Sequence, residues 1–146
     1  KNLFSLGKHA YVLDGDNIRL GLNKDLGFTR EDRAENVRRV SEVAHNFYEA
    51  GLITIVALVS PYSEDRAQAK ALFAAGDFIE VWVKTPVEVC AQRDPKGLYE
   101  KAAGGKLPNL TGVGQDYEPP ENANIVLDGT QTLDANVEVL LKALLD

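Results

Sequence analysis

Short apolar runs alternate along this chain with longer segments of helical periodicity. The runs at residues 10–13, 52–59, 78–83 and 125–128 are predicted strands. Residues 52–59 are nearly all apolar, which is typical of a strand covered on both faces. Strands that alternate with helices form βαβ units around a parallel sheet. The sequence therefore predicts an α/β fold.

The clearest predicted helix begins after Thr29 and runs to about Ala50. Thr29 and Asp32 form an approximate capping box, and Gly51 is expected to stop the helix. One face of this helix carries Val37, Val40, Ala44 and Phe47. Shorter helices are predicted over residues 18–22, 64–75, 87–93 (opened by Pro86) and 133–145.

Two segments do not fit the alternation. Residues 94–120 are rich in Gly, Lys and Pro, so we expect a surface segment that is functional or disordered. Residues 1–7 resemble the end of a helix closed by Gly7. That helix has no beginning here, so we expect the chain to start inside a domain.

Composition limits the classes of protein to consider. A chain of 146 residues with 45% hydrophobic and 26% charged residues is expected to form one domain, residues 1–146. The net charge of −6 argues against general nucleic-acid or membrane binding. The single Cys90 excludes an internal disulfide. We expect a cytoplasmic location.

Polar side chains follow the first two predicted strands. Asp14, Asp16 and Arg19 come after the first strand and Ser60 after the second. Strand ends of this kind present the chemistry of open α/β sheets, so we expect phosphate or sulfate handling here. Asp16 is a candidate proton acceptor or metal-linked acid, or simply a turn or N-cap carboxylate. Ser60 is a candidate nucleophile or a simple chain turn.

Arg33 and Asn36 lie one turn apart at the start of the long helix. Arg19 and Arg33 could hold an anion by charge-assisted hydrogen bonds. The equally weighted alternative is surface salt bridges with nearby acids, namely Glu31, Asp32 and Glu35.

Phe28 and the basic segment 93–106 each have two interpretations, and the two histidines predict no site. Phe28 either stacks on a ligand base or plugs the core, and plugging is the commoner role. The basic residues of segment 93–106 form either a flap over phosphates or a solvated loop. His9 and His45 have no partner at ligand spacing, so no metal site is expected on them.

Taken together, these segments resemble the adenylylsulfate kinase family over essentially the whole chain. The resemblance rests on the order and spacing of LDGDNIR (13–19), LGFT (26–29), DRAENVRR (32–39), SP (60–61), RDPKGLY (93–99), TG (111–112) and YEPP (117–120). It implies a P-loop NTPase-like, three-layer αβα fold with a parallel sheet. It also implies transfer of a phosphoryl group from MgATP to the 3′-hydroxyl of adenylyl sulfate, a step of sulfate activation and assimilation.

The resemblance also implies roles for individual residues. Asp16 matches the acid at the 3′-hydroxyl, Phe28 the aromatic on the substrate adenine, and Arg93 the ATP side. Ser60 matches a family phosphoserine, although direct in-line transfer needs no covalent step. Residues 94–120 match the family lid. The implied substrate residues are Asp16, Asn17, Arg19, Phe28, Arg33, Asn36, Val59, Ser60, Lys96, Asn109 and Leu110.

Two departures from the family pattern affect these expectations. The family lid usually reads Phe-Thr-Gly, and Leu110 cannot stack as an aromatic ring does, so a weaker adenine clamp is expected. The family also begins with a strand and a glycine-rich phosphate loop, of which residues 1–7 hold only the following helix's end. We expect these parts to precede Lys1, with the absent strand between strands 52–59 and 78–83. Residues 1–146 alone are not expected to catalyse the transfer.

Partners follow from the same resemblance. ATP with Mg²⁺ and adenylyl sulfate are the expected ligands, together with homo-oligomerisation and a possible fusion or association with ATP sulfurylase. The alternative function is a catalytically silent domain that binds adenylyl sulfate. A kinase for a neutral nucleoside or sugar fits less well, because Arg19 and Arg33 favour an anionic substrate.

Overall fold

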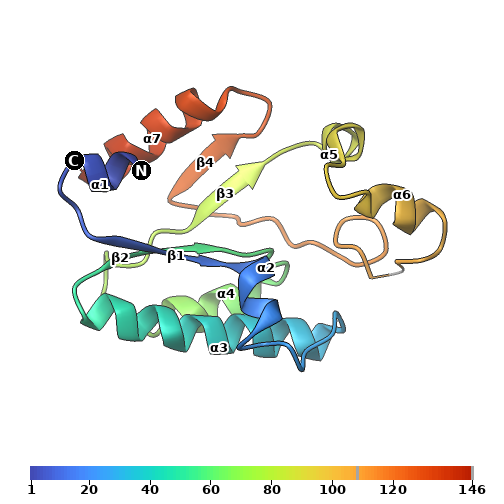
Figure 1. Cartoon of the computed structure of the whole chain (residues 1–146), viewed down its shortest axis with the longest axis horizontal. Helices are drawn as coiled ribbons and strands as arrows, with labels where there is room; N and C mark the ends of the chain where they lie inside the picture. Colours follow the sequence, from blue (N-terminus) through green and yellow to red (C-terminus); the bar gives the residue numbers. More distant parts are fainter. Residues whose placement is uncertain (108, 146) are drawn as a thin grey trace. The chain divides into compact units, whose positions relative to one another are not determined.

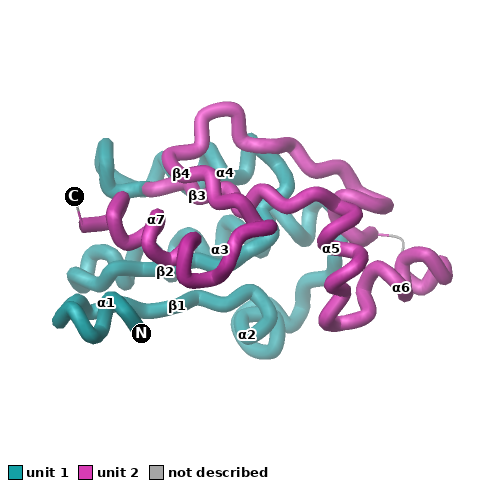
Figure 2. Tube along the Cα trace, turned by 90° about the horizontal axis from the view of Figure 1, so that it is seen from above, with its two compact units in different colours: residues 1–78 teal, residues 79–146 magenta. Residues whose placement is uncertain are grey.

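The computed structural model describes residues 1–107 and 109–145 as two compact units, residues 1–78 and 79–146 (Figure 2). The first unit contains α1 (Asn2–Ser5), β1 (Ala10–Asp14), α2 (Gly15–Leu20), α3 (Arg30–Glu49), β2 (Ile53–Ala57) and α4 (Ser63–Lys70). The second contains β3 (Val81–Lys84), α5 (Val87–Arg93), α6 (Leu98–Ala103), β4 (Ile125–Asp128) and α7 (Leu133–Leu145).

Each unit is built on one pair of parallel strands. In the first unit β1 pairs with β2, from Ala10 opposite Ile53 to Asp14 opposite Ala57. Helices α3 and α4 pack together on one side of this pair (Figure 1). In the second unit β3 pairs with β4, and α7 packs on β4. The parallel pairing expected from the sequence is confirmed.

The long helix α3 forms where the sequence predicts it. The Thr29 hydroxyl accepts a hydrogen bond from the Asp32 N–H at 3.2 Å, which satisfies a donor of the first turn. Gly51, just beyond the helix end, has a φ of 83°, a conformation that favours glycine. Across the described ranges, α3 included, no helix is long and apolar enough to cross a bilayer.

The core of the first unit lies between α3 and β1. Val40 is fully buried, and it clusters with Leu13 and Ala44. Phe47 and Phe73 pack against this cluster. The predicted apolar face of α3 is therefore confirmed, since residues at helical spacing on one face meet one strand.

The strand β2 is shorter and more exposed than expected. Ile55 and Val56 are 40% and 43% exposed, so the expectation of a strand covered on both faces is wrong for the described residues. The physical reason is that, in the first unit, β2 has β1 as its strand partner and α3 on one side. Strand β3 likewise begins at Val81 rather than at residue 78.

Two helices differ from expectation in their bounds, and a third helix is unexpected. Helix α2 begins at Gly15 rather than at residue 18, because Asp14 caps it. Helix α4 ends at Lys70 rather than at residue 75. Helix α6 is unexpected and lies inside segment 94–120. Asp94 stabilises its start by accepting hydrogen bonds from the backbone N–H groups of Leu98, Tyr99 and Glu100. Pro108 of that segment lies outside the described residues.

Replacing Val40 by Ala should destabilise the protein by about 2 kcal/mol, because a buried cavity replaces two methyl groups. The measurement is a urea unfolding curve of the variant against the wild type. Leu20→Ala is the control, since Leu20 is 82% exposed and its truncation should change the free energy of unfolding by less than about 0.5 kcal/mol. Equal effects of the two substitutions would contradict the assigned core.

Candidate anion-binding site at the end of the first strand

The turn from β1 into α2 carries two carboxylates, those of Asp14 and Asp16, which have different roles. Asp14 Oδ1 accepts hydrogen bonds from the backbone N–H groups of Asp16, at 3.0 Å, and Asn17, at 3.2 Å. Asp14 is therefore the N-cap, the structural role that the sequence left open for Asp16. The Asp16 side chain is exposed at the first turn of α2.

Gly15 allows α2 to start directly against the end of β2. A Cβ atom at this position would lie 2.8 Å from Leu58 Cδ2 and 3.2 Å from the Ala57 carbonyl oxygen. A side chain at Gly15 would require the Leu58 side chain and the Ala57 carbonyl group to shift. The first turn of α2 is consequently held next to the chain that leads to Val59 and Ser60.

Two guanidinium groups lie near one aromatic ring. Arg19 Cζ is 4.5 Å and Arg33 Cζ is 5.5 Å from the centroid of the Phe28 ring, both within the range of cation–π attraction. Phe28 is 47% exposed. The interpretation in which Phe28 plugs the core is therefore wrong, because its ring packs with cations at the surface.

Arg19 and Arg33 lie in an environment that disfavours a positive charge. Arg33 is only 8% exposed. Burial lowers the pKa of its guanidinium, and the nearby positive charge of Arg19 lowers it further, against an opposing effect of Tyr62. Burial also lowers the pKa of Arg19, while Asp32 raises it. Two positive groups kept close together in a partly buried site favour an anionic ligand.

Glu35, one of the acids near the start of α3, pairs with arginines other than Arg19 and Arg33. The Glu35 carboxylate accepts hydrogen bonds from Arg38 at 2.7 and 2.9 Å and from Arg39 at 2.8 Å. Arg39 also donates a bidentate pair of hydrogen bonds to the Asp25 carboxylate, at 2.8 and 3.0 Å. The predicted alternative of a salt bridge from Glu35 to Arg19 or Arg33 is therefore replaced by a network that ties loop 21–28 to α3.

Arginines also hold the segment that follows β2. Arg66 donates a hydrogen bond to the Ser60 carbonyl oxygen at 2.8 Å. Arg30 donates to both carboxylate oxygens of the buried Asp65, at 3.1 and 2.8 Å, and its Cζ lies 3.9 Å from the centroid of the Tyr62 ring. These contacts hold the Ser60 carbonyl group and the start of α4 in place.

The remaining predicted site residues belong to the second unit. Arg93 ends α5 and donates to the Gly129 carbonyl oxygen at 2.7 Å. Lys96, Asn109 and Leu110 lie in the segment after α5. Their place in one site with the first-unit residues stays a prediction.

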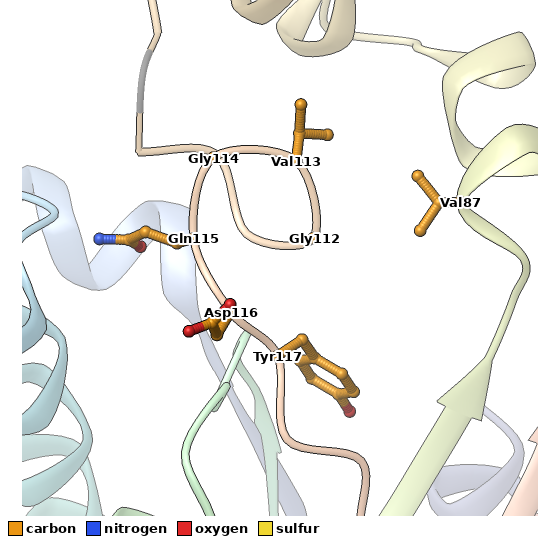
Figure 3. Close-up of a pocket in the computed structure, with 7 residues that line it drawn as sticks. All are labelled: Val87, Gly112, Val113, Gly114, Gln115, Asp116 and Tyr117. Carbon is orange, nitrogen blue, oxygen red and sulfur yellow. The ribbon is translucent and has the colours of Figure 1, made fainter.

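An open hollow of about 470 Å³ lies in the second unit beside this segment (Figure 3). Its wall is formed by Val87 and by loop residues 112–117. A Cβ atom at Gly112 would lie 3.7 Å from Val87 Cγ2, and the φ of Gly112, 81°, marks a tight turn. The hollow therefore belongs to the predicted lid segment.

Four residues support the pocket without lining it, and the sequence pattern does not indicate this role for them. Asn23, Asp25, Arg39 and Arg66 each hold another segment in place. Asn23 and Asp25 fall in a turn-rich stretch where polar residues are ordinary. No signal in a single sequence separates them from solvated loop residues.

Comparisons with known proteins show the family of this chain. The family model described as "Adenylylsulphate kinase" matches residues 1–128. An "Adenylyl-sulfate kinase" of Staphylococcus epidermidis is 50% identical over 145 residues, which cover 99% of this chain and 73% of that protein. The chain belongs to the adenylylsulphate kinase family. A "Bifunctional enzyme NodQ" of a Rhizobium species (strain N33) is 54% identical over 99% of this chain.

A solved structure extends the likeness to the fold. The "Mycobacterium tuberculosis APS kinase CysC in complex with AMPPNP and APS" matches with a TM-score of 0.95 at 42% identity, covering 99% of this chain and 85% of that one. The P-loop NTPase-like α/β fold implied by the sequence is confirmed. The chain spans only 22% of the length of the NodQ relative.

The Glu35 network should make stability depend on pH. Hydrogen bonds from Arg38 and Arg39 lower the pKa of Glu35 from 4.5 to about 2. A lowered folded-state pKa gives stability that is complete above pH 4.5 and is lost as the pH falls toward 2. Glu35→Gln should therefore lower the free energy of unfolding at neutral pH, and this difference from the wild type should become smaller as the pH falls from 4.5 toward 2. The measurement is the urea midpoint of both proteins across this range. A deficit that is constant with pH, or unaffected by high salt, would contradict this.

Proposed function

We propose that this protein transfers the γ-phosphoryl group of ATP to the 3′-hydroxyl of adenylyl sulfate, giving 3′-phosphoadenylyl sulfate. Membership of the adenylylsulphate kinase family supports this reaction. The likeness to the M. tuberculosis APS kinase supports it as well, because that protein was solved in complex with AMPPNP and APS.

The observation that carries the proposal is the placement of Arg19 and Arg33 beside the exposed ring of Phe28. Adenylyl sulfate joins a flat base to a phosphosulfate anion. An aromatic face suits the base, and guanidinium groups suit the anion. A neutral nucleoside or sugar carries no anionic group for these two guanidinium groups to bind, so it fits this pocket less well.

The mechanism assigns separate tasks to the residues around α2 and α3. Arg19, Arg33 and Asn36 hold the phosphosulfate, and Phe28 orients the adenine. The 3′-oxygen attacks the γ-phosphorus in line as the bond to the β-phosphate oxygen breaks and ADP leaves. Asp16, whose carboxylate is exposed at this site, accepts the 3′-hydroxyl proton. The transfer is direct, and Ser60 contributes to substrate contact together with Asn17 and Val59.

The second-unit residues complete the proposal. Segment 94–120 would act as the lid that excludes water, with Lys96, Asn109 and Leu110 on the substrate and Arg93 on the ATP side. Mg²⁺ would arrive with ATP, since this ion is usually held by phosphates and one or two carboxylates. In the alternative role given to Asp16 by the sequence, its carboxylate would hold this ion instead of accepting the proton. Homo-oligomer formation and an attached ATP sulfurylase stay predictions.

The proposal is tested with the protein in its natural flanking sequence, MgATP and adenylyl sulfate, by measuring formation of 3′-phosphoadenylyl sulfate. Asp16→Asn should lower kcat about 100-fold, as expected for a lost proton acceptor. Asp134→Asn, on α7, should leave kcat unchanged. Binding of adenylyl sulfate without product would identify a silent binding domain, and absence of binding would exclude both functions.

Arg33→Ala should raise the KM for adenylyl sulfate about tenfold or more, because a partly buried cation that meets the anion is lost. The KM for MgATP should not change. Arg38→Ala is the matched control, since Arg38 lies on the same helix and pairs with Glu35 at the surface. An unchanged KM for adenylyl sulfate in Arg33→Ala would show that the pocket is assigned to the wrong residues.

A further inference from the structure

Asn23 connects the three elements that carry the pocket of the first unit. Its backbone N–H donates to the Ile18 carbonyl of α2 at 3.0 Å, and its own carbonyl accepts from the Leu26 N–H at 3.1 Å. Its side-chain Nδ2 donates to Asn36 Oδ1 on α3 at 3.0 Å. The side chain of Asn23 is completely buried, and that of Asn36 nearly so.

We infer that Asn23 is a positioning residue for the anionic substrate, and this inference rests on the proposed function. Asn36 accepts from Asn23 through Oδ1, so the amide of Asn36 is held in one orientation. Its Nδ2 is then the end that can donate to a ligand, and an N–H donor is what a phosphosulfate oxygen requires. With the opposite orientation, Asn36 would present a carbonyl oxygen, which repels an anion.

The bonding of Asn23 argues against a purely structural role. Among the described residues, its buried Oδ1 has no hydrogen-bond partner. A buried amide oxygen without a partner lowers stability, whereas an apolar side chain of similar size would not. Stability therefore gives a weak reason for an amide here, and in the part of the chain that the structure describes its side chain bonds to Asn36, a residue of the proposed pocket.

The adjacent contacts show what Asn23 orients besides Asn36. Loop 21–28 also presents the Leu26 and Gly27 carbonyl oxygens, which accept from Arg19 Nη1 at 3.2 and 2.8 Å. These bonds leave Arg19 beside the Phe28 ring. Because Asn23 holds the start of this loop against α3, its loss should loosen both amide and guanidinium contacts to the anion.

The test is calorimetric binding of adenylyl sulfate, together with KM and kcat, on the protein in its natural flanking sequence. Asn23→Ala should weaken binding of adenylyl sulfate about tenfold while the KM for MgATP stays unchanged. In an Asn36→Ala background, Asn23→Ala should cause a clearly smaller loss, because the orienting bond is already absent. Equal losses in both backgrounds would overturn the inference.

Two further variants separate positioning from folding. Asn23→Asp keeps the shape but its carboxylate cannot donate to Asn36 Oδ1, so it should also weaken binding; wild-type affinity in this variant would overturn the inference. Phe47→Ala removes core packing eleven residues along α3 from Asn36, roughly 16 Å at the helical rise. It should lower the melting temperature yet retain affinity. If Phe47→Ala lost as much affinity as Asn23→Ala, general destabilisation would explain the effect of Asn23, and the inference would be overturned.

The same experiment distinguishes this inference from the proposed function. Wild-type protein that fails to bind adenylyl sulfate overturns the proposed function and the inference with it. Wild-type binding that is matched by Asn23→Ala overturns the inference alone.

Discussion

The candidate anion-binding site depends on the attachment of loop 21–28 to the first half of α3. The loop itself has little regular structure, and it contributes the Phe28 ring and the carbonyl groups that hold Arg19. The contacts that attach it include a buried amide pair, Asn23 with Asn36, and an exposed ionic contact, Arg39 with Asp25. The buried pair is insensitive to salt, whereas the exposed contact is screened. Of these two contacts, the amide pair is therefore the one that should persist at high salt.

The parts of the fold that the sequence predicted are those with a local physical cause. The bounds of β4, α5 and α7 match expectation, and Thr29 caps α3 as its sequence implied. Burial of Arg33 and Asn36 also follows from helical spacing, since they share a face with Val40. For the pocket, the sequence pattern named Arg19, Arg33 and Phe28, and the structure brings these three together.

What the sequence could not predict depends on contacts between distant segments. The exposure of β2 reflects which elements lie against it, and an apolar run says nothing about that. Helix α6 depends on a carboxylate four residues before its start, at Asp94, in a stretch whose composition favours loops. Likewise the partners of Glu35 are set by side-chain geometry, because acids and arginines are plentiful around it.

The arginine contacts around Ser60 have a consequence for how the first unit can respond to a ligand. Any shift of this segment would break the bond from Arg66 to the Ser60 carbonyl, and movement of α4 would separate Arg30 from Asp65. The surface formed by this segment and the start of α2 is consequently preorganised. Little chain entropy is then lost there on association, and more of the contact energy is available as affinity.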